Sequence, residues 1–285
     1  MTRRAVVCGG IAWNRMIHLD RFPDPTPATI FPVKTVDAVG SSGAGKAMNF
    51  ASLGWDVTFW TPVGEDEAGD RAVAEVEATG VEVIRFADPA GTAEHVNLMD
   101  TSGERISIFA RSGSFDLDIP VQEVRESFDG ADVISITQYN YCRPLLEPAR
   151  ETGVPVLIDI HDYDGVNPYH EQFFEAADWL FMSSLAHPGW EEFARDRQQV
   201  GSEIVVATHG SEGATALIDG QFHAVPAPSV PEIIDTNGAG DAFACGFADG
   251  WLASRDPEQA LAQAATQAGL AIAAPGLAPT SAEKM

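Results

Sequence analysis

Short apolar segments rich in β-branched residues alternate with segments of helical pattern along most of this chain of 285 residues. Strands are expected at residues 5–8, 57–60, 81–86, 133–137, 154–160, 179–182 and 204–208. Helices are expected at residues 44–53, 67–79, 121–128, 144–151, 168–176 and 189–196. This alternation is typical of a parallel sheet that is covered by helices. The sequence therefore predicts an open, mostly parallel α/β fold.

Two segments interrupt the alternation. Residues 30–39 and 93–110 have strand-like composition without an intervening helix, and Ser102-Gly103 predicts a hairpin turn. The simplest arrangement of such extra strands is a small lid over the carboxyl ends of the main strands, where ligands bind in these folds. We expect one domain over residues 1–285, with lid strands inserted at about 14–39 and 92–112. A second hairpin around Asp219-Gly220 and two further helices complete the expected fold.

The charge and cysteine content restrict the partners and the compartment. Acidic residues number 42 against 17 basic ones, for a formal net charge of -25. A field of this sign disfavours binding to nucleic acids and to anionic membranes. The cysteines are Cys8, Cys142 and Cys245, too few and too far apart for a disulfide framework or a zinc site. With no apolar signal-peptide core among the first ten residues, we expect a cytoplasmic protein that binds a small molecule.

The stretch I-I-D-T-N-G-A-G-D-A-F at residues 233–243 carries the most chemical information. Its apolar start reads as extended chain, and the aromatic residues that follow recur at helical spacing. Residues 238–240 therefore stand at a predicted helix start, where unpaired amides and the helix dipole attract phosphate oxygens. Asp241, in the first turn, is placed to accept a proton from a hydroxyl that attacks a phosphoryl group. An ordinary acidic stabiliser of the helix start explains Asp241 equally well at this point.

A second glycine cluster, T-H-G-S-E-G at residues 208–213, follows a predicted strand. A turn at the carboxyl end of such a strand is where a nucleotide binds in α/β folds. A plain turn between two strands accounts for the same residues.

Together these segments resemble the PfkB, or ribokinase-like, family of carbohydrate kinases. D-T-N-G-A-G-D at 235–241 matches the signature of the family, T-H-G-S-E-G has the spacing of its nucleotide loop, and residues 40–54 resemble its sugar loop. The resemblance extends from residue 5 to about residue 280. It implies an α/β domain with a β lid, ATP as the donor, and transfer of the γ-phosphate to a sugar hydroxyl.

The resemblance also implies roles for individual residues. Asp241 would be the catalytic base, with an anion hole made by the amides of Gly238, Ala239 and Gly240. The nucleotide would lie against Thr208, Gly210, Gly213 and Thr236. The acceptor would lie near Asn14, Gly40, Gly43 and Lys46. A monovalent cation, K⁺, would be held at Asp235, Asn237, Gly276 and Thr280. Mg²⁺ would arrive with ATP, and lid strands in the family can pair between subunits, which implies a homodimer.

Three departures from the family pattern concern the acceptor and Mg²⁺. Asn14 stands where many members have an Asp that grips sugar hydroxyls, and Gly45 stands where many have an Asn. Lys46 would add a cation if it faces the pocket, and acidic sugars would then be favoured. Ser183 and Ala186 replace both polar members of an N-x-x-E element that orders the waters around Mg²⁺.

The function expected is ATP-dependent phosphoryl transfer to a hydroxyl of a sugar, sugar acid, polyol or nucleoside. The alternative is a binding or regulatory protein that retains the kinase fold with little catalysis. A P-loop at residues 40–46 is disfavoured because Ala47 replaces the Mg²⁺-binding hydroxyl. A metal hydrolase built on the acidic cluster at residues 159–164 is disfavoured because its spacing defines no metal geometry. Arg105 is a candidate for contact with the substrate, although a solvated strand position is the favoured interpretation, and His95 is expected to be a surface or capping residue.

Overall fold

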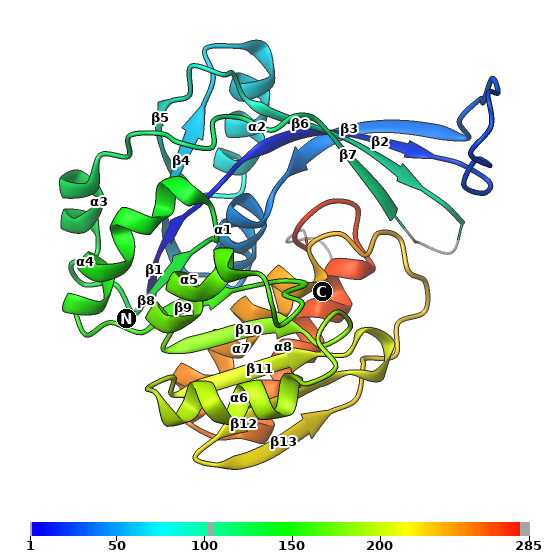
Figure 1. Ribbon diagram of the computed structural model, residues 1–285. Coiled ribbons are helices and arrows are strands. Elements are labelled where there is room, and N and C mark those ends of the chain that lie inside the picture. Colours follow the sequence, from blue (N-terminus) through cyan, green and yellow to red (C-terminus); the bar gives the residue numbers. More distant parts are fainter. Residues whose placement is uncertain (1, 102–104, 280–285) are drawn as a thin grey trace.

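The computed structural model describes residues 2–101 and 105–279 of the chain (Figure 1). Its larger sheet is built from β1 (Arg4–Cys8), β4 (Asp56–Val63), β5 (Glu82–Ala87), β8 (Val133–Ile136), β9 (Val156–Asp159), β10 (Trp179–Ser183), β11 (Ile204–Thr208), β12 (Ala214–Ile218) and β13 (Gln221–Val225). The strand order is β13-β12-β11-β10-β9-β8-β1-β4-β5. Neighbours from β5 to β11 pair in parallel, whereas β12 and β13 form the expected antiparallel hairpin. The predicted mostly parallel sheet is confirmed.

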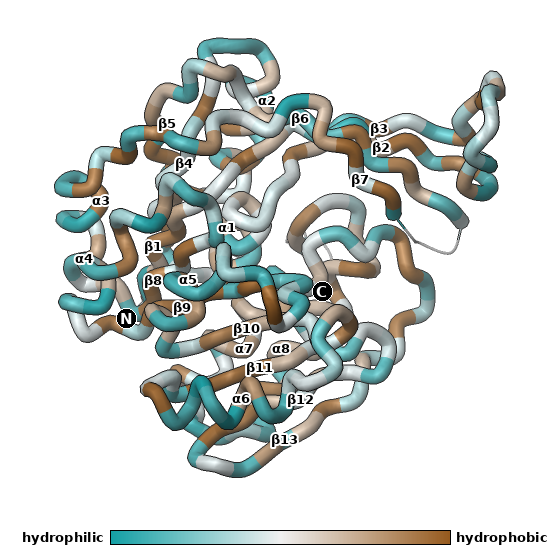
Figure 2. Tube along the Cα trace, in the orientation of Figure 1, coloured by the Kyte–Doolittle hydropathy of each residue, from teal (hydrophilic) through white to brown (hydrophobic). Residues whose placement is uncertain are grey.

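Helices cover both faces of this sheet. They are α1 (Ser42–Ser52), α2 (Glu67–Glu77), α3 (Val121–Ser127), α4 (Leu146–Glu151), α5 (Glu171–Ala176), α6 (Trp190–Gln199), α7 (Ala239–Ser254) and α8 (Pro257–Ile272). Val7 of β1 packs in the core with α1, α7 and α8, whereas Val6 and Cys8 pack in the core with α3 to α6. Burial on both faces explains why the strands read as continuous apolar runs. Figure 2 shows hydrophobic colour along β10 and β11 and hydrophilic colour over much of α6.

Two helices begin differently from the prediction. The helices expected at 144–151 and 168–176 each start with a 3₁₀ turn, at Asn140–Leu145 and Pro168–His170. Pro144 lies inside the first of these turns, and Pro168 opens the second. Proline has no backbone N–H to donate, so it is accommodated in a first turn and marks an irregular start. No helix in the described part of the chain is both long and apolar enough to cross a membrane.

The smaller sheet contains β2 (Ala12–His18), β3 (Lys34–Gly40), β6 (Ala93–Met99) and β7 (Arg105–Arg111), in the order β3-β2-β6-β7. In Figure 1 it extends above the C-terminal part of the chain, drawn in orange and red. The strand expected from residue 30 begins only at Lys34, and the segment expected at 93–110 divides into β6 and β7. The turn predicted at Ser102-Gly103 lies outside the described residues. We call this sheet the lid.

Glycines bring the first elements together below the lid. A Cβ at Gly43, in the first turn of α1, would lie 2.6 Å from the carbonyl oxygen of Gly10, which follows β1. Real side chains never approach a backbone oxygen so closely, so only glycine permits α1 to start here. The N-terminus of α1 therefore lies directly against the carboxyl end of β1.

Candidate active site

A cavity of about 460 Å³ lies between the lid and the start of α7, and we call it the active-site pocket. From the lid it is lined by Asn14, His95, Asn97, Arg105, Ser107 and Phe109. From the large domain it is lined by Ser41, Ser42, Tyr139, Asp159, His161, Asp162, Thr236, Asn237, Gly238, Ala239, Gly240, Asp241 and Leu277. Residues 233–243 thus meet the lid, as expected of a ligand site at the carboxyl end of a parallel sheet.

The start of α7 has the geometry of an anion-binding site. Gly238 precedes the helix in the left-handed conformation, with φ of 79°. A Cβ at this position would also lie 2.9 Å from the carbonyl oxygen of Leu277. Both the backbone conformation and the lack of space therefore require glycine at position 238. The first amides of α7 have no acceptor within the helix, and they carry the positive end of its dipole. Gly240 faces open space, because a Cβ at this position would meet no described heavy atom beyond its own helix within 4 Å.

Asp241 lies in the first turn of α7 and is 8% exposed at the wall of the pocket. Its Oδ1 accepts a hydrogen bond from Ser42 Oγ at 2.5 Å and another from Lys46 Nζ. Its Oδ2 lies above Gly45, where a Cβ would be only 2.5 Å away. The asparagine that many family members carry at position 45 would therefore collide with Asp241 in this structure.

Lys46 does not face the acceptor. It is 1% exposed, and its ammonium lies beneath the pocket, where it contacts Ser42 Oγ at 2.8 Å and Asp159 Oδ2 at 3.3 Å as well as Asp241. Burial alone would lower the pKa of Lys46, but the attraction of the two carboxylates outweighs burial and raises that pKa. The condition under which Lys46 would favour acidic sugars is not met. Because Gly45 and Lys46 lie inside α1, residues 40–46 also do not form a P-loop.

Of the other residues expected near the acceptor, Asn14 lines the pocket. It is 3% exposed, and its Oδ1 has no hydrogen-bond partner among the described residues. A buried acceptor without a donor is costly, so this oxygen is suited to a ligand hydroxyl. Gly40 and Gly43 serve packing: a Cβ at Gly40 would lie 1.9 Å from Asn14 Nδ2, and Gly43 contacts the end of β1.

The expected nucleotide loop follows β11. Thr208 ends that strand, and Gly210 and Gly213 both adopt positive φ around a short 3₁₀ turn. His209 fixes the loop, because its two ring nitrogens contact Ser184 Oγ at 2.7 Å and Thr215 Oγ1 at 2.9 Å. Thr236, the fourth residue expected at the nucleotide, lines the active-site pocket.

The residues expected around K⁺ are partly described. Asp235 Oδ1 accepts a hydrogen bond from the amide of Asn237 at 2.8 Å, and burial raises the pKa of Asp235. Gly276 has a positive φ and precedes Leu277, whose carbonyl approaches Gly238. Thr280 lies outside the described residues. Oxygen donors from two segments thus lie beside the start of α7, which suits a hard cation.

The lid supplies two residues whose roles the sequence did not reveal. Arg105, although exposed, lines the pocket and donates a hydrogen bond to Asn237 Oδ1. His95 also lines the pocket, and its ring lies 4.1 Å from that of Phe109. Burial, and to a lesser extent Arg105, lowers the pKa of His95. Arg105 is exposed, as expected, but both residues also line the pocket, because the pairing of β6 with β7 turns them toward the start of α7.

The acidic cluster after β9 does not have, among the described residues, the arrangement of a site that ligates a metal ion directly. In the described residues, no group of three or more His, Cys, Asp and Glu side chains is arranged to hold a metal ion. Asp159 is instead paired with Lys46 and accepts a hydrogen bond from the amide of His161 at 2.9 Å. Burial alone would raise the pKa of Asp159, but His161 and Lys46 lower it well below its usual range. Asp162 lines the pocket, exposed, and no ion pair joins it to another described residue.

Comparison with known proteins identifies the family to which this chain belongs. The model of the pfkB family carbohydrate kinases matches residues 6–285. The chain belongs to this family.

Relatives and solved structures agree with that assignment. The ATP-dependent ribose-1-phosphate kinase of Halopiger xanaduensis is 29% identical over 90% of this chain and 88% of its own length. The acarbose 7(IV)-phosphotransferase of an Actinoplanes species is 27% identical over 90% of this chain and 87% of its own. A microbiome-derived acarbose kinase superposes with a TM-score of 0.88 and 26% identity, covering 98% of this chain and 95% of its own.

The Arabidopsis thaliana ribokinase, whose structure holds ribose and ATP, superposes with a TM-score of 0.81 and 21% identity, and the overlap covers 100% of this chain and 97% of that one. This likeness confirms the fold. With the family assignment, the expected activity is also confirmed: this pfkB family protein is an ATP-dependent carbohydrate kinase that phosphorylates a sugar. The alternative of a binding protein with little catalysis finds no support.

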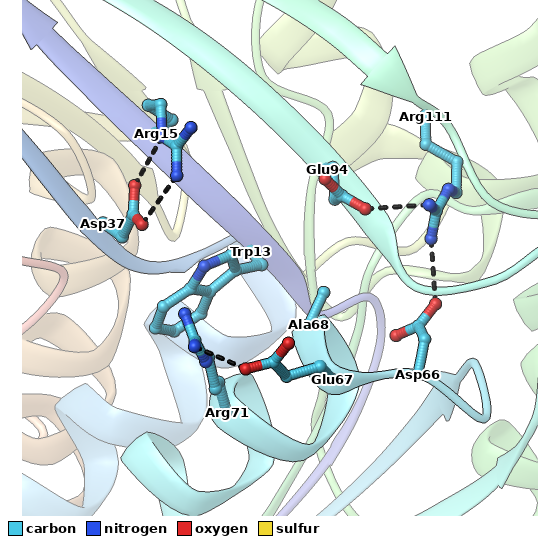
Figure 3. Close-up of a pocket in the computed structure, with 9 residues that line it drawn as sticks. All are labelled: Trp13, Arg15, Asp37, Asp66, Glu67, Ala68, Arg71, Glu94 and Arg111. Carbon is cyan, nitrogen blue, oxygen red and sulfur yellow. Dashed lines mark hydrogen bonds and ion pairs between the residues drawn. The ribbon is translucent and has the colours of Figure 1, made fainter.

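A second cavity of this pfkB family kinase, of about 310 Å³, lies on the opposite face of the lid, between the lid and α2 (Figure 3). We call it the rear pocket. Successive residues of a strand point to opposite faces, so Trp13 and Arg15 line the rear pocket while Asn14 lines the active-site pocket. Its charges pair with one another: Arg15 with Asp37 at 2.8 Å, Arg71 with Glu67 at 2.5 Å, and Arg111 with Asp66 at 2.8 Å and with Glu94 at 2.9 Å.

Proposed function

We propose that this kinase transfers the γ-phosphate of ATP to a sugar hydroxyl with Asp241 as the general base and the amides of Gly238, Ala239 and Gly240 as the anion hole. One observation carries the proposal. The carboxylate and the amides at the start of α7 lie together at the wall of a pocket that the lid covers. Phosphoryl transfer needs little more from the protein than positioning, charge stabilisation and a proton acceptor.

The contacts of Asp241 indicate which oxygen takes the proton. Oδ1 is occupied by Ser42 and Lys46, whereas no hydrogen bond joins Oδ2 to another described residue. In this proposal the acceptor hydroxyl donates to Oδ2 and attacks the phosphorus from that side. The amides at the start of α7 then stabilise the charge that develops on the phosphoryl oxygens.

The nucleotide site proposed runs from the loop after β11 to the pocket. Thr208, Gly210 and Gly213 would lie along the nucleotide, and Thr236 would lie near its phosphates. The positive φ values of both glycines bring backbone close to the ligand without a Cβ in the way. ATP binding would then depend on residues other than Asp241.

The metal ions belong to the proposal as well. Asp235, Asn237 and Gly276, with Thr280, would hold K⁺ beside the anion hole, where its charge strengthens the field on the phosphates. Burial raises the pKa of Asp235, and a cation bound beside its carboxylate would favour the charged form. Mg²⁺ would bridge the ATP phosphates. Because Ser183 and Ala186 offer it no carboxylate, Asp162 is the pocket residue proposed to bind its waters.

The acceptor proposed is a sugar that carries an anionic group. Arg105 and His95 place a guanidinium and an imidazole on the lid side of the pocket. Asn14 Oδ1, which has no hydrogen-bond partner among the described residues, would accept a hydrogen bond from a sugar hydroxyl. Arg105 thus supplies the cation that Lys46 does not. The Halopiger xanaduensis relative is named for a sugar phosphate acceptor, whereas the acarbose enzymes are named for an oligosaccharide. Both classes belong in the test.

We also propose that the kinase is a cytoplasmic homodimer joined through the lid. Exposed apolar side chains lie on lid strand β7, at Ile106 and Ile108, and in the segment that leads into lid strand β3, at Phe31 and Val33. All three cysteines are buried and free, as suits a reducing compartment. Light scattering at micromolar concentration tests the dimer, and a charged residue in place of Ile108 should yield monomers.

The function is tested with a panel of sugars, sugar phosphates, sugar acids, polyols, nucleosides and acarbose. ADP release and phosphorus-31 NMR of the product are measured for each acceptor. We expect at least one acceptor to be phosphorylated, with anionic sugars ahead of neutral ones. A protein that binds ATP yet phosphorylates nothing would contradict the proposal, and a clear preference for acarbose would contradict the acceptor class.

A further inference from the structure

Helices α1 and α7 pack against each other beneath the active-site pocket, and each contributes two polar side chains to the contact. Ser42 and Lys46 are four residues apart on α1, and Asp241 and Cys245 are four residues apart on α7, so each pair lies on one helix face. Ser42 Oγ donates to Asp241 Oδ1 at 2.5 Å, Lys46 Nζ donates to the same oxygen, and Cys245 Sγ donates to the carbonyl of Lys46 at 3.4 Å. The contact therefore fixes one oxygen of Asp241 from two directions.

Stability is a weak explanation for this arrangement. Lys46 is among the largest fully buried side chains of the described structure, and Asp159 is 7% exposed. Burying an ammonium and carboxylates costs hydration energy that their attraction often fails to recover, and apolar residues of similar volume often serve stability as well or better. Met48 and Phe50, on the same helix, show that α1 buries apolar side chains readily. The buried charge of Lys46 is therefore better explained by a role in the reaction than by a role in stability.

We propose that Lys46 is a positioning residue for phosphoryl transfer: it holds Asp241 through Oδ1, so that Oδ2 faces the acceptor, and it places a positive charge beside the carboxylate. Asp159, on the other side of the ammonium, balances its charge. This inference rests on the proposed role of Asp241 as the base. It assigns to Lys46 a function that acts through Asp241 and not through the acceptor.

The charge balance around Asp241 defines the expected pH dependence. The titratable groups near it are Lys46 on α1, Asp159 at the end of β9, Tyr139 after β8 and Cys245 on α7. Burial raises the pKa of Tyr139 and of Cys245, so both are neutral near pH 7. Lys46 and Asp159 are therefore the charged neighbours of the carboxylate, and they act on it in opposite directions. His161 lies one step further away, against Asp159.

The test compares four variants at saturating ATP and acceptor across a range of pH. Lys46→Met removes the cation with little change of volume. Asp159→Asn removes the balancing carboxylate, and the double variant removes both charges. Lys34→Met is the matched control, since Lys34 is exposed on lid strand β3. Circular dichroism and thermal melting show whether each variant is folded.

We expect Lys46→Met to lower kcat about tenfold or more while the KM for ATP stays within about threefold, because the anion hole is unchanged. Removal of a neighbouring cation makes a carboxylate harder to ionise. The acidic limb of the kcat profile should therefore move to higher pH by about one unit or more. Asp159→Asn should move the same limb to lower pH, and Lys34→Met should leave the profile unchanged.

A kcat of Lys46→Met within about twofold of wild type, or a lower kcat with an unmoved limb, would overturn the proposal and leave a structural ion pair. If Lys46→Met does not fold, the double variant decides the question by comparison with Asp159→Asn. A limb at higher pH in the double variant supports the proposal, and coincident limbs overturn it. Asp241→Asn is measured in parallel: if it retains activity, the proposed base itself is wrong, whereas an inactive Asp241→Asn beside an unaffected Lys46→Met refutes the role of Lys46 alone.

Discussion

The two pockets on opposite faces of the lid are both lined by charged side chains, yet their charges are arranged in different ways. In the rear pocket, Arg15, Arg71 and Arg111 each pair with a carboxylate. In the active-site pocket, the ammonium of Lys46 is buried under the wall, while Arg105 and the start of α7 face the cavity. Arginines that are already paired with carboxylates attract an anion only weakly, whereas a helix N-terminus attracts it through the positive end of the helix dipole.

Exposure separates the pockets as well. The side chains of Arg15 and Arg71 are 58% and 53% exposed, so water and salt screen their ion pairs. Asp159 and Asp241 are 9% exposed at the side chain, and Lys46 is 1% exposed. Charge density alone therefore does not identify a phosphate site. What distinguishes the active-site pocket is a fixed carboxylate beside the backbone amides of a helix N-terminus.

Apart from the loss of Asp241 itself, the comparison predicts its largest change at Gly45. In Gly45→Ala the new Cβ would lie 2.5 Å from Asp241 Oδ2 and would displace the proposed base. We expect kcat to fall about a hundredfold, the scale of a 1 Å misplacement in a catalytic site. Steady-state kinetics measure the loss. Gly189→Ala is the control, because its Cβ would meet His187 only at an ordinary 3.5 Å. Equal activity in both variants would show that Oδ2 has room to move.

Arg105 provides the next largest effect if the acceptor is anionic. Arg105→Gln removes the guanidinium that lines the pocket while keeping a side chain able to hydrogen-bond Asn237. We expect the KM for an anionic sugar to rise about tenfold or more, since a charge-assisted contact is lost. The KM for a neutral sugar should change little. Equal increases for both acceptors would indicate a role in closing the lid instead of recognising charge.

Potassium tests the cation proposed beside the anion hole. We expect K⁺ to raise kcat severalfold over a bulky organic cation at matched ionic strength, because a bound cation near the α7 amides strengthens their field. Asp235→Asn should reduce this activation. Identical rates in both salts would contradict a specific cation site.

The rear pocket should show the smallest effects. Arg15→Gln breaks an exposed ion pair with Asp37, so we expect the free energy of unfolding to change by only about 0.2–1 kcal/mol. Its kcat should stay within about twofold of wild type, because no residue of the rear pocket reaches the proposed base. Denaturant unfolding and steady-state kinetics measure the two quantities. A large loss of activity would show that the two faces of the lid are coupled.

The site was predictable where its signals are local. Gly238 adopts a positive φ just before α7, and Asp241 lies in the first turn of that helix. Both features depend on residues that are adjacent in the sequence. The strand at 204–208 was predicted with the bounds that β11 has. Parallel strands buried on both faces leave apolar runs that need no knowledge of their partners.

Other parts depend on contacts that the sequence does not display. Lysine is almost never fully buried, so nothing local signals that Lys46 meets Asp241 across the α1–α7 contact. His95 and Arg105 reach the pocket through the register of β6 and β7, which the strand composition does not specify. Within the lid insertion expected at about 14–39, only residues 30–39 were predicted as a strand, and β2, Ala12–His18, begins two residues before that insertion.

The central claim is that Asp241 is the base, and Asp241→Asn tests it most directly. Asn keeps the size of Asp but cannot take the hydroxyl proton, so kcat should fall by about a hundredfold to ten-thousandfold. The dissociation constant of ATP, measured by calorimetry, should change little because the anion-hole amides and the nucleotide loop are intact. Asp37→Asn, in the rear pocket, is the matched control and should retain its kcat. An Asp241→Asn variant that keeps more than about a tenth of wild-type turnover on the best acceptor would contradict the account.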